Sequence, residues 1–80
     1  MLRARVYVTL KKSVFDPQGR TIHEALGSLG YASVADVRQG KFFELELDLP
    51  AEAARPLLEE LAQRVLSNPV IEAFRVELLP

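Results

Sequence analysis

The sequence contains no cysteine and a single histidine, His23. A chain without cysteine cannot form a disulfide, use a thiolate nucleophile or build the common cysteine-ligated zinc sites, and a reducing cytoplasm is its simplest location. His23 flanks an apolar helical stripe and has no second histidine or cysteine with which to form a catalytic pair or a zinc site. These absences predict an ordinary boundary role for His23 and no catalytic or metal site on the chain.

Long apolar runs and an excess of one charge are also missing. No stretch approaches the roughly 20 apolar residues that a membrane-spanning helix needs, and a strand pattern begins directly after Met1 without a signal peptide. Ten basic and 11 acidic residues give a net charge of −1, so no general attraction to nucleic acid or anionic lipid is expected. We therefore expect a soluble, cytoplasmic protein with neither a nucleic-acid nor a membrane partner.

The length limits the size of the core. We interpret the 80 residues as one domain, residues 1–80, and a domain this small buries only about 60% of the surface that its unfolded chain exposes. Such a domain is marginally stable alone, and association with a second copy is a natural remedy. We therefore expect a homodimer, in which strand edges are available for pairing.

Three stretches alternate between apolar and polar residues, which is the pattern of a strand with one buried face. They cover residues 2–10, 42–49 and 70–79, and a shorter stretch with two valines, residues 34–38, precedes the second. Gly40 lies between residues 34–38 and 42–49 and can supply the positive φ of a tight turn. The pattern predicts a β-hairpin centred on this turn.

The first of two predicted helices begins at Asp16-Pro17, where aspartate is a natural N-cap and proline a favoured first residue. Gly30 fits the left-handed position after the helix, and Tyr31 then closes back on it in a Schellman arrangement. Gly19 and Gly27 lie inside this helix and each costs about 1 kcal/mol relative to alanine. Close packing or a nearby partner would explain them.

The second predicted helix begins near Pro50 and ends before Asn68-Pro69, because proline disfavours helical geometry in the residue before it. Pro56 fits this helix poorly, since a proline beyond the first turn removes a backbone hydrogen bond. We expect a kink there, or a late and irregular first turn.

The order of these elements, β-α-β-β-α-β, predicts an α+β fold of the ferredoxin-like type, with two helices on a four-stranded antiparallel sheet of strand order 4-1-3-2. In that order the first strand lies between the third and the fourth. Arg3 and Arg5 on its open face then lie opposite acids, and such pairs contribute about 0.2 to 1 kcal/mol each. The acids are Glu44, Glu46, Asp48 and Glu77.

Two binding functions have simpler alternatives. The acids at positions 44, 46 and 48 share one strand face and offer oxygens to a hard cation, but a solvated, salt-bridged face is the favoured explanation. The segment Gly40-Lys41-Phe42-Phe43 is similar to the RNP1 pattern of RNA-binding sheets. However, Phe42 and Phe43 are adjacent, so they point to opposite faces, and the neighbouring acids repel phosphate.

Three segments resemble the PurS family in their order and spacing: Asp16-Pro17-Gln18-Gly19, residues 37–41 (VRQGK) and residues 66–72 (LSNPVIE). The resemblance covers nearly the whole chain, and the length also matches. Ser67 departs from the family, which has alanine before Asn-Pro. PurS is the small subunit of phosphoribosylformylglycinamidine synthase in purine biosynthesis.

The resemblance implies a homodimeric subunit of an ATP- and glutamine-dependent carbon–nitrogen ligase, with no active site of its own. In this family the large synthetase subunit, PurL, uses ATP and magnesium, and the glutaminase subunit, PurQ, frees ammonia from glutamine. The small subunit docks the two together so that ammonia can pass, and it needs no cofactor. A ligand-binding regulatory module of ferredoxin-like topology is the alternative function.

The residues that we expect to contact partners lie in the turns and at the start of the first helix: Arg38, Gly40, Lys41, Asp16 and Asn68. Two of them, Arg38 and Lys41, flank the predicted hairpin turn. The turn geometry needs only Gly40, so we expect both cations to be exposed and dispensable for the fold.

Overall fold

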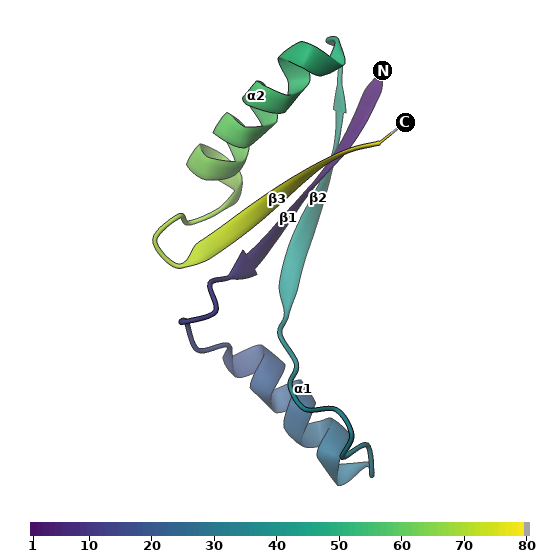
Figure 1. The fold of residues 1–80 in the computed structure, drawn as a ribbon, viewed down its shortest axis with the longest axis vertical. Coiled ribbons are helices and arrows are strands. Elements are labelled where there is room, and N and C mark those ends of the chain that lie inside the picture. Colours follow the sequence, from purple (N-terminus) through teal and green to yellow (C-terminus); the bar gives the residue numbers. More distant parts are fainter. Residues whose placement is uncertain (80) are drawn as a thin grey trace.

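The computed structural model describes residues 1–79 and confirms the α+β class. Its three strands form one antiparallel sheet in the order β2-β1-β3, so β1 is central (Figure 1). In chain order the elements are β1 (Leu2–Leu10), α1 (Pro17–Ser28), β2 (Gly40–Leu47), α2 (Ala51–Leu61), the π-helical segment η1 (Ala62–Leu66) and β3 (Glu72–Leu79).

The prediction of a fourth strand and a central hairpin is wrong. Residues 34–38 are irregular, and the sheet of the described residues contains three strands. The physical reason is that this segment packs against α1 and not against β2. The carbonyl oxygen of Val34 lies 2.8 Å from Nε2 of His23, and the backbone of Val37 lies against Gly19 in the first turn of α1.

Gly40 also differs from its predicted role. It is the first residue of β2 and pairs with Thr9, whereas the positive φ among the described residues belongs to Gly30, at 95°. A Cβ atom at position 40 would lie 2.6 Å from both the carbonyl oxygen of Val8 and Cγ2 of Thr9. The absence of a side chain therefore allows β2 to approach β1 closely, and no turn is involved.

The predicted position of the first strand is confirmed. β1 pairs with β2 so that Arg3 faces Glu46 and Arg5 faces Glu44, and it pairs with β3 so that Arg5 faces Glu77. Nε of Arg5 lies 3.4 Å from Oε2 of Glu44. Asp48 follows the end of β2 and is not part of this set.

The core lies between the sheet and α2. Alternate residues of β1 point towards this helix, as their period of two predicts, and the buried side chains come from these two elements and the first residue of η1. They are Ala4, Val6, Val8, Ala54, Leu58 and Ala62. α2 begins at Ala51, directly after Pro50, and includes Pro56, so its first turn is neither late nor irregular. The irregular turn is η1, at the opposite end.

The ends of α1 are as predicted. Asp16 is the N-cap, with Oδ1 accepting a hydrogen bond from the N–H of Gly19 at 2.9 Å, and Pro17 is the first helical residue. At the other end the N–H of Tyr31 donates to the carbonyl oxygen of Leu26 at 2.9 Å, which closes the Schellman arrangement around Gly30.

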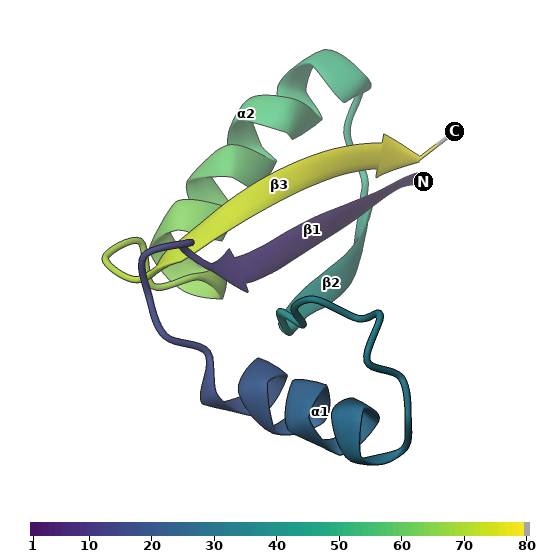
Figure 2. The ribbon, with the colours of Figure 1, turned by 60° about the horizontal axis from the view of Figure 1, so that its bottom comes forward.

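α1 extends beyond the end of the sheet and does not cover it (Figures 1 and 2). The chain measures 48 × 28 × 14 Å, and its radius of gyration is 15.9 Å. A compact chain of this length would have about 12 Å. The prediction that both helices pack on the sheet is therefore wrong for the single chain, because α2 alone packs on the sheet.

The carboxylate of Asp16 is held in its ionised form. Hydrogen bonds from the backbone N–H of Gln39, first, and of Gly19, second, lower the pKa of Asp16. Asp16 is only 5% exposed, so its two carboxylate oxygens receive their hydrogen bonds from these backbone donors and have little access to water.

Replacing Gly40 with alanine is expected to destabilise the chain by about 1 to 3 kcal/mol, because the new methyl group would push β2 away from β1. Gly27 provides the matched control, since a Cβ atom there would meet nothing within 4 Å. Gly27→Ala should stabilise the chain by about 0.5 to 1 kcal/mol, because alanine favours the helix. Urea unfolding measures both, and two changes of the same sign would contradict the assignment.

The contribution of Asp16 to stability should depend on pH. Its pKa is lower in the folded chain than the value of about 3.9 in an unfolded one, so the ionised carboxylate stabilises the fold above about pH 4. That contribution is lost as the pH falls through the folded-state pKa. The difference in urea midpoint between the parent and Asp16→Asn should therefore be largest at pH 7 and shrink below pH 4. Asp48→Asn, at an exposed position, should stay close to the parent at pH 7.

Candidate assembly surface

The residues predicted to contact partners lie along one end of the sheet. A shallow cleft of about 300 Å³ brings Asp16, Gly40 and Lys41 together with Glu72. Glu72 links this cleft to Asn68, since one of its carboxylate oxygens accepts a hydrogen bond from the N–H of Asn68 at 2.7 Å. Sequence reasoning did not single out Glu72, although it ends one of the three family segments.

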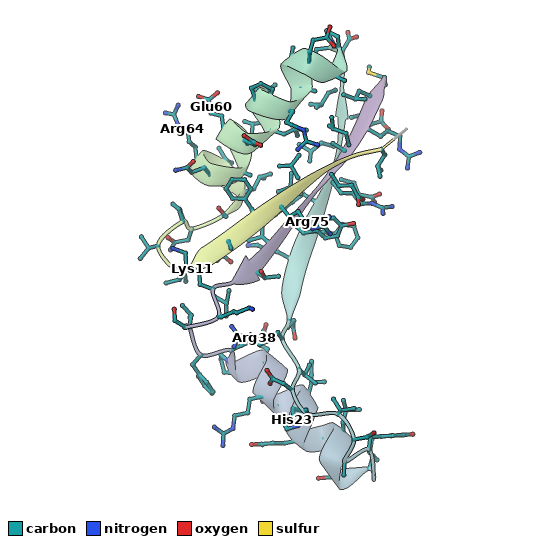
Figure 3. All side chains as sticks on the ribbon, viewed as in Figure 1. Lys11, His23, Arg38, Glu60, Arg64 and Arg75 are labelled. Atoms are coloured by element: carbon teal, nitrogen blue, oxygen red, sulfur yellow. The ribbon has the colours of Figure 1, made fainter. Side chains whose placement is uncertain are left out.

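Arg38 is not the free cation that the sequence suggested. Its Nη2 donates hydrogen bonds to the carbonyl oxygens of Lys11 and Val14, both at 3.0 Å. Figure 3 places Arg38 between the start of α1 and the loop that carries Lys11. Arg38 is exposed, as expected. Its side chain nevertheless connects two segments 24 or more positions apart, which speaks against a dispensable role, and the effect of removing it stays a prediction.

Lys41 is an exposed cation, as the sequence predicted. Its side chain is 55% exposed, and its only ion pair among the described residues is with Glu72, at 4.0 Å. The ammonium group also lies 5.7 Å from the centre of the Phe43 ring. An ion pair at 4.0 Å with an exposed lysine contributes little, so Lys41 is free to serve another contact.

Asn68 forms the turn before β3. Its Oδ1 accepts a hydrogen bond from the N–H of Val70 at 3.2 Å, and its carbonyl oxygen accepts from the N–H groups of Ile71 and Glu72. These bonds give Asn68 a structural role. Contact between Asn68 and a partner stays a prediction, as it does for the other four residues.

His23 connects α1 to the irregular segment that follows it. Its ring lies near a hollow of about 430 Å³ that is also lined by Phe15, Arg20, Asp36 and Arg38. Arg20 is paired with Glu24 on the same helix, at 3.0 Å. The polar groups around this hollow are thus of mixed charge and largely engaged with one another.

The open face of the sheet is a second candidate surface, which sequence reasoning missed. Arg75 lies 4.3 Å from the centre of the Tyr7 ring, and the ring of Tyr7 lies 5.9 Å from that of Phe42. Arg5 lies over Phe42 at 5.8 Å, and Phe42 is 55% exposed. Aromatic residues and arginine are enriched at protein interfaces. The signal in the sequence was an aromatic residue at the polar position of two neighbouring strands.

The cation-site and RNA-binding alternatives gain no support. Within residues 1–79, no three histidine, cysteine or acidic side chains gather closely enough to hold a metal ion. Phe43 packs against the core while Phe42 is exposed, so these two rings lie on opposite faces, as their adjacency predicts. No helix in the described part of the chain is long and apolar enough to cross a membrane.

Comparison with known proteins identifies the family. The family model described as "PurS: Phosphoribosylformylglycinamidine (FGAM) synthase" matches residues 3–80. The PurS subunit of Bacillus subtilis is 43% identical over 77 residues, which are 96% of this chain and 92% of that protein. The PurS subunit of Mycobacterium leprae is 45% identical over 76 residues, which are 95% of this chain and 94% of that protein.

Solved structures agree with the family match. The structure of Bacillus subtilis PurS has a TM-score of 0.88 with 41% identity, and the match covers 100% of both chains. A chain in the structure of PurLQS from Thermotoga maritima has a TM-score of 0.89 with 29% identity, covering 98% of this chain and 96% of that one. In sequence and in fold, this chain belongs to the PurS family.

Proposed function

We propose that this chain is the small, non-catalytic subunit of phosphoribosylformylglycinamidine synthase. In this role it docks the glutaminase subunit, PurQ, to the ATP-dependent synthetase subunit, PurL, and assists the transfer of ammonia between them. The observation that carries the proposal is the end-to-end match to PurS subunits, which extends to a chain of the Thermotoga maritima PurLQS structure. The complex is a carbon–nitrogen ligase of purine biosynthesis, and we place it in the cytoplasm.

The polar groups of this chain fit a docking role. Asp16, Arg38 and Asn68 bind backbone groups, and Arg20 and Arg64 each pair with an acid four positions away in the sequence. Side chains used in this way build surfaces and turns. We expect ATP and magnesium to act on the synthetase subunit, with no cofactor on this chain.

We also propose that the chain is a homodimer. Within the described residues β2 and β3 each pair with β1 alone, so their outer edges are open to another strand. α1 carries Ile22, which is 41% exposed, and ends beside Leu29, which is 72% exposed. In a dimer with a two-fold axis, the same contact would bury the apolar side of α1 in both copies.

A charge on the apolar side of α1 should disrupt this dimer. We expect Leu29→Glu to shift the chain from a dimer towards the 9.0 kDa monomer at micromolar concentration, because burying an unpaired carboxylate is unfavourable. Val65→Glu, an equally exposed position at 72% on η1, is the control and should remain dimeric. Sedimentation velocity measures both. A parent chain that sediments only as a monomer would refute the homodimer.

The docking function can be tested by reconstitution with purified PurL and PurQ. We expect synthesis driven by glutamine to require this chain, whereas synthesis driven by free ammonium should proceed without it. The chain alone should neither hydrolyse glutamine nor turn over ATP. If both reactions were independent of the chain, and a small metabolite raised its melting temperature in place of the partner subunits, the ligand-binding alternative would be favoured.

A further inference from the structure

The first turn of α1 is tied to the residues just before β2 by a compact set of contacts, which we call the latch. Its members come from the start of α1 and from the segment that leads into β2. They are Asp16, Gln18, Gly19, Arg38 and Gln39.

Asp16 lies at the centre of the latch. Its Oδ1 accepts from the N–H of Gly19 inside α1, at 2.9 Å, while its Oδ2 accepts from the N–H of Gln39, at 2.7 Å. One buried carboxylate therefore satisfies two backbone donors that are 20 positions apart in the sequence. Separating α1 from Gln39 would leave one of these groups without its partner, which is costly in a buried place.

Arg38 connects the segment before β2 to the loop that leads into α1. It extends from the segment before β2 to the carbonyl oxygens of Lys11 and Val14, in the loop between β1 and α1. Nε2 of Gln39 adds a third connection by donating to Oε1 of Gln18 at 2.8 Å. A side chain at position 19 would overlap the carbonyl oxygen of Val37, so glycine there permits this close approach.

The latch matters because the rest of α1 extends past the sheet (Figure 2). A helix of 12 residues is about 18 Å long. A rotation of about 10° at its first turn would therefore displace its far end by about 3 Å, which is enough to misplace an interface side chain. Of the exposed apolar residues, Ile22 lies near the middle of α1 and Leu29 lies directly after its far end, where the displacement is largest.

We propose that Asp16 and Arg38 are positioning residues, which fix the direction of α1 relative to the sheet so that its apolar side is preorganised to meet a second copy of the chain. Their effect on assembly is then indirect and does not require either side chain to touch a partner. Preorganisation of this kind increases affinity because less conformational freedom is lost on binding. The inference rests on the proposed function only in that α1 must meet a partner.

The orientation of α1 can be measured on the chain itself, without PurL or PurQ. Because the parent has no cysteine, Ser28→Cys at the end of α1 and Gln63→Cys on η1 give two unique and exposed sites for spin labels. An excess of unlabelled chain keeps labelled copies apart. We expect a narrow distance distribution in this background and a clearly broader one after Arg38→Ala.

Asp16→Ser separates the latch from helix capping. Serine can still accept the hydrogen bond from Gly19, but it has no second oxygen for Gln39. We expect it to retain the helical circular dichroism of the chain and yet to broaden the distance distribution, with a loss of about tenfold in the affinity of one copy for another. Arg55→Ala, at an exposed position on α2 outside the latch, is the control and should change both readouts by less than twofold.

The outcomes distinguish the alternatives. An unchanged distance distribution in both Asp16→Ser and Arg38→Ala would overturn the latch, whatever happens to assembly. Weakened assembly with an unchanged distribution would indicate direct partner contact by these residues instead. If Arg38→Ala does not fold, Asp16→Ser decides the question alone. A broadened distribution without any requirement for the chain in glutamine-driven synthesis would support the latch while refuting the docking function.

Discussion

The carboxylate of Asp16 determines where one of the two helices lies. α2 is held by apolar packing on the sheet, and this packing involves many side chains and is non-directional. α1 has no comparable support, and its attachment depends on a few directional hydrogen bonds between its first turn, Gln39 and the loop residues bound by Arg38. The molecule thus combines a region fixed by hydrophobic burial with a helix whose direction depends on polar contacts.

A packed region and a projecting helix suit a protein of the PurS family. A chain whose residues 1–79 extend over 48 Å leaves apolar groups exposed that a compact domain would bury, and association is the physical way to cover them. The open sheet face adds a second kind of surface, where Arg5 lies over the exposed ring of Phe42 and Arg75 lies over the half-buried ring of Tyr7. Two different surfaces on one small chain are what a subunit that joins larger proteins requires.

Two of the candidate assembly residues are of the same charge but have different roles in the structure. Arg38 and Lys41 are three positions apart, and both are cations near a glycine, so the sequence treats them alike. In the structure Arg38 binds two backbone carbonyl groups, whereas Lys41 has a long ion pair with Glu72 and a contact with the Phe43 ring. The difference arises from the path of the loop between β1 and α1, which passes within reach of position 38. The path of this loop cannot be predicted from the residues around position 38.

The sequence by itself determined the features that depend on near neighbours along the chain. The period of two placed the three long strands, the Asp16-Pro17 pair began α1, and Gly30 ended it, because alternation and capping are properties of a few consecutive residues. Only the tertiary structure decided the fate of residues 34–38 and the role of Gly40. A short stretch with two valines becomes a strand only if another strand is its partner. Here its backbone packs against α1 instead, and Gly40 is required because β1 lies too close for any side chain.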